Sequence, residues 1–177
     1  MTQDLVVLVA PDGTPCGTAD RGTVHGSDTP LHFAFSCHVL DDDGRLLVTR
    51  RALSKKTWPG VWTNSFCGHP RPDETVEDAI HRYGRRELGL GVTDLRPILP
   101  DFRYRAVDAG GVVENEVCPV FVARPDGPVQ PNPDEVMEYV WAPADEVWAS
   151  TLRTPWLFSP WFVEQVRSLA DHPGIAR

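Results

Sequence analysis

The chain has 177 residues, of which 41% are hydrophobic and 24% are charged, proportions typical of one globular domain. This composition excludes a disordered tail, a collagen-like chain and a coiled coil, and no apolar run approaches the roughly 20 residues of a membrane-spanning helix. A net charge of −8 gives no general attraction to nucleic acid or to anionic lipid, so we expect neither a nucleic acid nor a membrane as a partner.

The elements expected in the first half of the chain are strands, a turn and a long loop. An apolar run over 5–10 predicts a buried strand, and 31–40 predicts a second, longer strand. The segment 41–44, Asp-Asp-Asp-Gly, predicts a hairpin turn leading into a strand over 46–49. We expect an irregular loop over 52–66.

The second half of the chain combines helices with short strands. A helix is predicted over 75–88, with Asp73 or Glu74 as its cap and Gly89 as its end. The intermixed elements, without regular βαβ alternation, predict an α/β fold in which helices flank a mixed β-sheet. The remaining expected elements are strands over 102–106, 114–123 and 138–141, a Pro-rich loop over 124–133, and helices over 143–150 and from about 161 to 170.

The four cysteines indicate a reducing compartment. Their spacings fit no zinc ribbon, and the N-terminus has no basic segment of a secretory signal. We therefore expect reduced thiols in a cytoplasmic, monomeric protein whose single domain covers residues 1–177. Cys37 and Cys118 stand among apolar residues, which favours positions in the core.

Two carboxylates and an imidazole have a spacing that favours a metal site. Glu114 and Glu116 are two residues apart on an expected strand, so they point to the same face, and Cys67 and His69 have the same spacing. Two carboxylates turned inward need compensation, which a divalent cation supplies. A pair that faces solvent would need none, and this alternative stays open.

The histidines narrow the ligand set. His32 and His38 are six residues apart on one expected strand, roughly 20 Å at about 3.3 Å per residue, so at most one of them can join the site. A mixed set of imidazoles and carboxylates suits Mn²⁺, Zn²⁺ or Mg²⁺ and is too soft for Ca²⁺. The choice among these three metals stays open.

Basic residues cluster locally although the chain is acidic. Arg50-Arg51 is followed by Lys55-Lys56, and two arginines flank Tyr104. A local basic patch on an acidic protein suits a small anionic ligand better than a long polyanion. A solvated face is the alternative.

The segment 68–90 resembles the Nudix box, G-x5-E-x7-R-E-U-x-E-E-x-G-U. In that box a loop and a helix carry glutamates that hold Mg²⁺ on a diphosphate. Tyr83 and Arg86 replace two of those glutamates, so the resemblance implies the Nudix fold with chemistry other than hydrolysis. The matching residues are Gly68, Glu74, Arg82, Glu87, Gly89 and Leu90.

Further segments over about residues 4–165 resemble the type 1 isopentenyl-diphosphate Δ-isomerases, a family of the Nudix superfamily. The resemblance implies the reversible conversion of isopentenyl diphosphate to dimethylallyl diphosphate, a reaction of isoprenoid biosynthesis, through a tertiary carbocation. It implies a small prenyl diphosphate as the substrate. The segments that carry the resemblance are 50–56, 58–62, 63–70, 100–105, 114–119 and 159–161.

The resemblance also implies catalytic roles. It implies Cys67 and Glu116 as the two proton-transfer groups, with the Tyr104 hydroxyl beside the glutamate and the Trp161 indole facing the carbocation. The bare sequence leaves other readings: Trp161 as a core residue, Tyr104 as a stacked strand residue and Cys67 as an inert thiol.

Two metal sites and a diphosphate site follow from the same resemblance. It implies Mg²⁺ held with the diphosphate through Glu87, beside the basic residues Arg21, Arg51 and Lys55. Position 83 is often basic in this family, so Tyr83 removes one expected diphosphate contact. The implied ligands of a second metal, Mn²⁺, Zn²⁺ or Mg²⁺, are His25, His32, His69, Glu114 and Glu116.

Two other functions remain open at this point. One is a Nudix hydrolase that cleaves a diphosphate, against which Tyr83 and Arg86 argue. The other is a diphosphate-binding module without catalytic activity, against which Cys67, Glu116 and Tyr104 argue.

Overall fold

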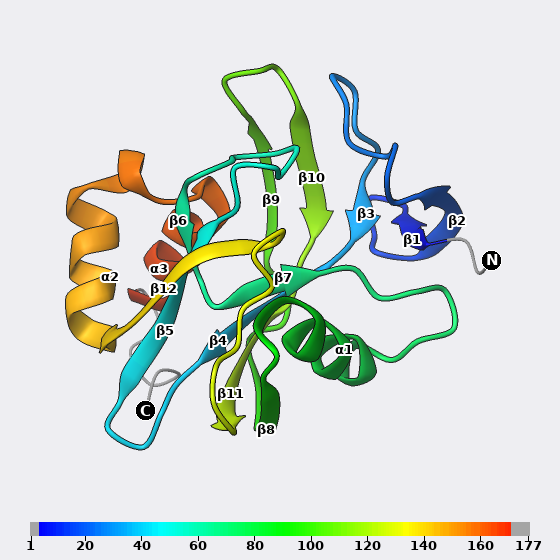
Figure 1. The fold of residues 1–177 in the computed structure, drawn as a ribbon. Coiled ribbons are helices and arrows are strands. Elements are labelled where there is room, and N and C mark those ends of the chain that lie inside the picture. Colours follow the sequence, from blue (N-terminus) through cyan, green and yellow to red (C-terminus); the bar gives the residue numbers. More distant parts are fainter. Residues whose placement is uncertain (1–3, 171–177) are drawn as a thin grey trace.

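The computed structural model describes residues 4–170, and its elements are arranged in three sheets with helices around them (Figure 1). The expected domain over 1–177 extends beyond the described residues at both ends. The five-stranded sheet has the order β2 (Pro15–Asp20), β1 (Leu5–Val9), β3 (His32–Phe33), β10 (Val113–Val117), β9 (Arg103–Val107). The four-stranded sheet has the order β7 (Phe66–Gly68), β4 (Phe35–Val39), β11 (Val120–Asp126), β8 (Gly91–Leu99). The three-stranded sheet has the order β12 (Val136–Pro143), β5 (Arg45–Arg51), β6 (Trp62–Thr63).

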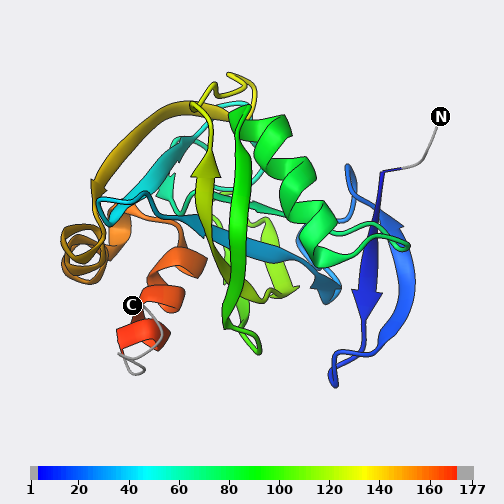
Figure 2. The ribbon, with the colours of Figure 1, turned by 90° about the horizontal axis from the view of Figure 1, so that it is seen from below.

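The helices cover both faces of the four-stranded sheet. Helices α1 (Val76–Leu88) and α3 (Pro160–Ala170) lie on opposite sides of it, as Figure 2 shows. Helix α2 (Ala144–Arg153) lies beside β12 and is followed by the short 3-10 helix η1 (Pro155–Leu157). Within residues 4–170, no helix combines the length and apolar character needed to cross a membrane. The predicted α/β fold with flanking helices is confirmed.

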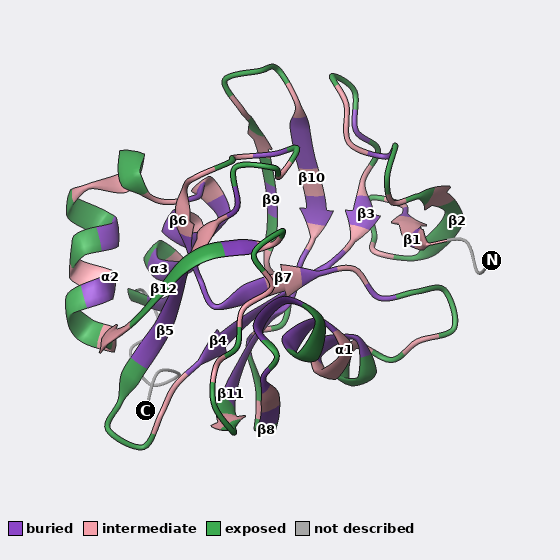
Figure 3. Cartoon of the chain, viewed as in Figure 1, coloured by how far each residue is buried: buried purple, intermediate pink, exposed green. Residues whose placement is uncertain are grey.

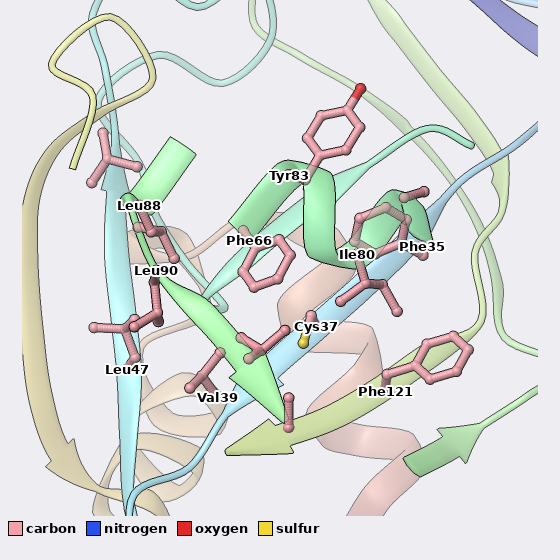
Figure 4. Close-up of a cluster of buried hydrophobic side chains, with 14 residues drawn as sticks. Phe35, Cys37, Val39, Leu47, Phe66, Ile80, Tyr83, Leu88, Leu90 and Phe121 are labelled. Atoms are coloured by element: carbon pink, nitrogen blue, oxygen red, sulfur yellow. The ribbon is translucent and has the colours of Figure 1, made fainter. Parts of the chain in front are cut away.

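Strand β4 is buried on both of its faces (Figure 3). Phe35, Cys37 and Val39 point toward α1 and join the largest apolar cluster, which Figure 4 shows. Ser36 and His38 alternate with them and hydrogen-bond to Gln165 on α3. Polar side chains therefore occupy one face of a fully buried strand, and Cys37 lies in the core as predicted.

Two segments expected as single strands each divide between two sheets. The run 31–40 breaks at Ala34, so its first part pairs with β10 and its second part with β11, both in parallel. The run 114–123 breaks at Cys118-Pro119, at the same level. Backbone hydrogen bonds join the two breaks, from Ala34 N to Val117 O and from Ser36 N to Pro119 O. The pattern of apolar residues cannot reveal where a strand passes from one sheet to the other. That position depends on the strand with which it pairs and not on its own side chains.

Several expected boundaries were wrong for related reasons. The loop expected over 52–66 contains β6 and the start of β7. These segments are too short to show a strand pattern, and they become strands by pairing with β5 and β4, respectively. The loop expected over 124–133 begins only after Asp126. The turn over 41–44 is present, but the strands it joins share only one bridge, between Leu40 and Leu46.

The strands β2 and β8 are absent from the sequence-based expectation. Both carry exposed residues along much of their length, so neither shows an apolar alternation.

Helix α1 was predicted closely, but its cap is Thr75 rather than Asp73 or Glu74. Its C-terminal end at Gly89 is left-handed, with φ of 58°, as a glycine permits.

Candidate active site

Four side chains from four segments bring their metal-binding atoms together. His25, His32, His69 and Glu116 each offer one nitrogen or oxygen, and these atoms all lie within 4.8 Å of one another. His32 and Glu116 are directly paired across the parallel strands β3 and β10. His69 follows β7, and His25 lies in the loop between β2 and β3. The fold thus brings together four of the five ligands implied by the resemblance.

Glu114, the fifth implied ligand, lies beside this group. Its Oε2 is 2.9 Å from Nε2 of His25, and its Oε1 accepts a hydrogen bond from Thr57 at 2.7 Å. Glu114 Oε2 and His25 Nε2 are both buried, and neither takes part in a hydrogen bond of acceptable geometry. Buried polar atoms normally have partners, so a shared cation would satisfy both.

The tautomer of His32 also fits a metal ligand. Its Nδ1 lies 2.9 Å from the carbonyl oxygen of Pro30, to which it donates a hydrogen bond. With a cation bound, a neutral His32 would present the lone pair of Nε2, which lies 3.2 Å from His69 Nε2. The site thus offers two imidazole nitrogens next to a carboxylate. Mn²⁺, Zn²⁺ and Mg²⁺ can each be bound by such a set of ligands.

The carboxylate of Glu116 is held in its charged form. Its Oε1 lies 2.9 Å from Nε2 of His69 and 3.4 Å from Nε2 of His32. Burial acts to raise the pKa of Glu116, but the two imidazoles outweigh burial and hold that pKa well below its usual value. Glu116 is therefore an anion that belongs to the metal-binding group and also lines the cavity.

The sulfur of Cys67 lies among neutral hydrogen-bonding groups. Its Sγ is 3.2 Å from Ser36 Oγ, 3.3 Å from Asn64 Nδ2 and 3.4 Å from Asn64 Oδ1. Burial raises the pKa of Cys67 to about 12, although these hydrogen bonds act in the opposite direction. The group is thus a thiol at neutral pH.

Tyr104 and Trp161 complete the apolar end of the site. Tyr104 is paired with Glu116 across β9 and β10, so the two side chains lie next to each other on one face. The ring centroids of Tyr104 and Trp161 are 5.7 Å apart, and the indole nitrogen of Trp161 donates to Asn64 Oδ1 at 3.1 Å. Burial, followed by the charge of Glu116, raises the pKa of Tyr104.

The site residues implied by the resemblance, except His32, line one cavity of about 460 Å³. Its volume lies within the usual range of about 300–1,000 Å³ for small-molecule sites. The site residues implied by the resemblance that line it are Cys67, Glu116, Tyr104, Trp161, His25, His69, Glu114, Glu87, Arg21, Arg51 and Lys55.

The basic residues that line this cavity are already ion-paired or hydrogen-bonded. Lys55 contacts Glu135, and its Nζ lies 3.5 Å from Oε1 of Glu87. Arg21 donates to Asp4 at 2.5 Å. Burial raises the pKa of Glu87, while the charge of Lys55 opposes it. Glu87 lies on α1, outside the group of four metal-binding side chains.

Arg51 contacts both the loop after β5 and the ring of Trp161. Its guanidinium donates to the carbonyl oxygens of Thr57 and Trp58 at 2.8–3.2 Å. Its central carbon lies 5.2 Å from the centroid of the Trp161 ring, within the range of a cation–π contact. The backbone of the loop after β5 therefore fixes the position of this charge.

Sequence reasoning missed the residues that hold the site in place. Asn64 contacts both Cys67 and Trp161, Thr57 contacts Glu114, and Glu135 contacts Lys55. Ser36 left a signal, because with His38 it repeats a polar residue at every second position of an apolar run, and Asn64 lies within segment 63–70 that carries the resemblance. The other contacts join segments far apart in the chain.

Comparison with known proteins agrees with this fold. A family model described as the NUDIX domain matches residues 30–162, most of the chain. A solved structure from Deinococcus radiodurans aligns with a TM-score of 0.71 at 20% identity, covering 93% of this chain and 98% of the other. The MutT NUDIX hydrolase of Burkholderia pseudomallei aligns with a TM-score of 0.53 at 24% identity, covering 65% and 84%. The fold is therefore that of the Nudix superfamily.

Sequence relatives define the family more narrowly. The isopentenyl-diphosphate Delta-isomerase of Clavibacter michiganensis subsp. michiganensis is 56% identical over 177 residues, covering 98% of this chain and 91% of that protein. The enzyme of the same name from Salmonella paratyphi B is 57% identical over 165 residues, covering 93% and 91%. The chain belongs to the isopentenyl-diphosphate Delta-isomerase family.

Proposed function

We propose that this protein is an isomerase that interconverts isopentenyl diphosphate and dimethylallyl diphosphate. The observation that carries the proposal is that two proton-transfer groups, Cys67 and Glu116, line one cavity with the aromatic rings of Tyr104 and Trp161. Cationic side chains that can receive a diphosphate line the same cavity. The names of the relatives support isopentenyl diphosphate as the substrate and isomerisation as the reaction.

The reaction moves a double bond by one carbon. One proton is added at a terminal carbon, and another is removed two carbons away, so the net composition of the substrate does not change. Protonation of the unactivated alkene leaves a tertiary carbocation between the two positions. An acid and a base must therefore flank the carbon skeleton, and Cys67 and Glu116 can exchange these roles because the reaction is reversible.

The carbocation needs stabilisation without a nucleophile. The indole face of Trp161 provides it through its quadrupole, worth up to about 2 kcal/mol or more in a desolvated site. Water must be excluded because it would trap the cation. Trp58, whose ring is 5.5 Å from that of Trp161, supports this role by packing against the indole.

The metal ions have separate places in this proposal. His25, His32, His69, Glu114 and Glu116 would hold one Mn²⁺, Zn²⁺ or Mg²⁺, and Glu87 would help to hold Mg²⁺ on the diphosphate. A cation in the first site supplies fixed positive charge, which lowers the proton affinity of groups beside it. Arg21, Arg51 and Lys55 would bind the diphosphate. The monomeric state and the cytoplasmic location expected from the sequence belong to the same proposal.

The direct test is proton NMR of the purified protein with isopentenyl diphosphate and Mg²⁺ in D₂O, with phosphorus spectra of the same sample. We expect the dimethylallyl isomer to appear with deuterium incorporated while the diphosphate signals stay unchanged. Release of inorganic phosphate would instead indicate a hydrolase. Binding without any change in either spectrum would indicate a module without catalytic activity.

A chelation arm tests the metal sites. We expect exhaustive removal of divalent metals to abolish turnover, and Mg²⁺ together with Mn²⁺ or Zn²⁺ to restore it. Elemental analysis of the untreated protein would identify the ion at the histidine site. Full activity in the metal-free protein would contradict both sites.

A further inference from the structure

A line of buried polar side chains ends at the sulfur of Cys67 from the side away from the cavity. His38 Nε2 lies 2.9 Å from Gln165 Oε1, Gln165 Nε2 donates to Ser36 Oγ at 2.8 Å, and Ser36 Oγ lies 3.2 Å from Cys67 Sγ. His38, Gln165 and Ser36 are each 0% exposed. None of the three lines the cavity. Burying these polar side chains is costly unless they are hydrogen-bonded, and here they form a hydrogen-bonded chain that ends at Cys67, a proposed catalytic residue.

The hydrogen bonds of this line have one favoured direction. His38 carries its proton on Nε2 and donates to Gln165, which leaves its buried Nδ1 as an acceptor without a partner. The reverse arrangement would leave Nδ1 with a buried N–H that has no acceptor, and an unpaired buried donor is rarer than an unpaired acceptor. Burial lowers the pKa of His38 to about 4, so the ring is neutral at pH 7.

The direction fixes what the hydroxyl of Ser36 can do. Because Ser36 Oγ already accepts a hydrogen bond from Gln165, its own hydrogen is available for a sulfur. Two sulfurs are within reach, Cys67 at 3.2 Å and Cys118 at 3.5 Å. The shorter contact is to Cys67, and Asn64 Nδ2 reaches the same sulfur from another side at 3.3 Å.

We propose that Ser36, Gln165 and His38 are positioning residues that direct a hydrogen bond onto the sulfur of Cys67 and hold it in place for proton transfer. This inference rests on the proposed function, in which Cys67 is a proton-transfer group. No proton moves along the line. The hydrogen bond to sulfur is stronger when the sulfur carries more negative charge, so its benefit falls on the chemical step and not on substrate binding.

The test compares Ser36→Ala, Gln165→Met and the double variant by steady-state isomerisation of isopentenyl diphosphate. We expect each single variant to lower kcat about tenfold, the loss of one hydrogen bond to a charged group, with KM changed less than twofold. The double variant should lose no more than Ser36→Ala alone, because Gln165 acts only through Ser36.

Variants at His38 separate hydrogen bonding from packing. His38→Gln keeps an N–H where Nε2 lay and should retain most of the kcat, whereas His38→Phe removes the donor and should lower kcat. Leu169→Ala, also buried on α3 but outside the line, is the control for general loss of stability. Urea unfolding of every variant shows whether its fold survives. The result for each variant can be interpreted independently of the others.

The outcomes separate this inference from the proposed function. An inactive wild-type protein overturns the proposed function and the positioning role with it. An active wild type overturns only the positioning role if Gln165→Met keeps full kcat, or if the two single losses multiply in the double variant. A loss in His38→Gln equal to that in His38→Phe also overturns it.

Discussion

The two proposed proton-transfer groups have opposite surroundings. Cys67 contacts a hydroxyl and an amide, and burial raises its pKa, whereas Glu116 contacts two imidazoles and its pKa is held low. One cavity therefore contains a protonated thiol and a charged carboxylate at neutral pH. A pair of groups in different protonation states is what a reaction that both adds and removes a proton requires.

The first prediction concerns these two side chains directly. We expect Cys67→Ala and Glu116→Gln each to lower kcat about a thousandfold or more, because each variant lacks one of the two proton-transfer groups. Deuterium incorporation by NMR measures the loss. Cys16→Ala, at an exposed cysteine on β2, is the matched control and should keep wild-type activity. Comparable activity in all three variants would remove Cys67 and Glu116 from their roles.

Gly68, between Cys67 and His69, is needed because of a close approach. A Cβ at this position would lie 2.5 Å from ring atoms of Tyr83, which is itself buried in the apolar core. We expect Gly68→Ala to destabilise the protein by about 1–3 kcal/mol, the usual cost of overpacking. Urea unfolding measures the change. Gly17→Ala, where a Cβ meets only Leu8 at 3.7 Å, should change stability much less.

At the scale of elements, helix α1 shows what a local pattern can predict. Gly89 placed its end correctly, and the predicted start at residue 75 was one residue early, because both the cap and the stop signal lie within a few residues of the helix. The cap is Thr75, whose Oγ1 accepts from Asp78 N at 3.1 Å. Three neighbouring residues with capping side chains, Asp73, Glu74 and Thr75, made the exact start ambiguous.

The cap gives a prediction for the stability of this helix. Thr75→Ala leaves the N–H of Asp78 without its acceptor, and we expect a loss of about 1 kcal/mol in the free energy of unfolding. Thr75→Ser keeps the hydroxyl and should stay within a few tenths of a kcal/mol of wild type. An equal loss in the two variants would show that the hydroxyl does not cap the helix.

The strands were predicted less well than the helix. The residues of 31–40 and 114–123 satisfy strand patterns throughout, yet each run changes sheets where its partner does. Among the described residues, only His32 of the two histidines joins the metal-binding group, as expected, although the single strand assumed in that argument is in fact divided into β3 and β4. The site residues implied by the resemblance line one cavity or adjoin it, but the supporting contacts of Asn64 and Thr57 depend on tertiary structure that no local pattern encodes.

At the scale of the whole molecule, the buried line behind Cys67 affects stability as a function of pH. The pKa of His38 is about 4 in the folded protein, against 6.5 for an unperturbed histidine. The unfolded chain therefore binds this proton more readily, and stability falls as pH drops from about 6.5 to 4. The full difference corresponds to about 3 kcal/mol as an upper bound.

The measurement is urea unfolding between pH 7.5 and 4 for wild type and His38→Gln. Other groups, including Glu116, also lose stabilising contacts in acid, so the informative quantity is the difference between the two proteins. We expect wild type to lose more stability than His38→Gln over this interval. Parallel curves would contradict a neutral His38 in the folded state.

The two parallel pairings, β3 with β10 and β4 with β11, have a consequence for how the enzyme is made. Each pairing joins positions on either side of the whole stretch 40–112, so the proposed metal ligands His32 and Glu116 cannot meet until that loop has closed. Hairpins such as β1–β2 and β9–β10 need only local closure. During synthesis or refolding, catalytic competence should therefore appear last, after most of the secondary structure has already formed.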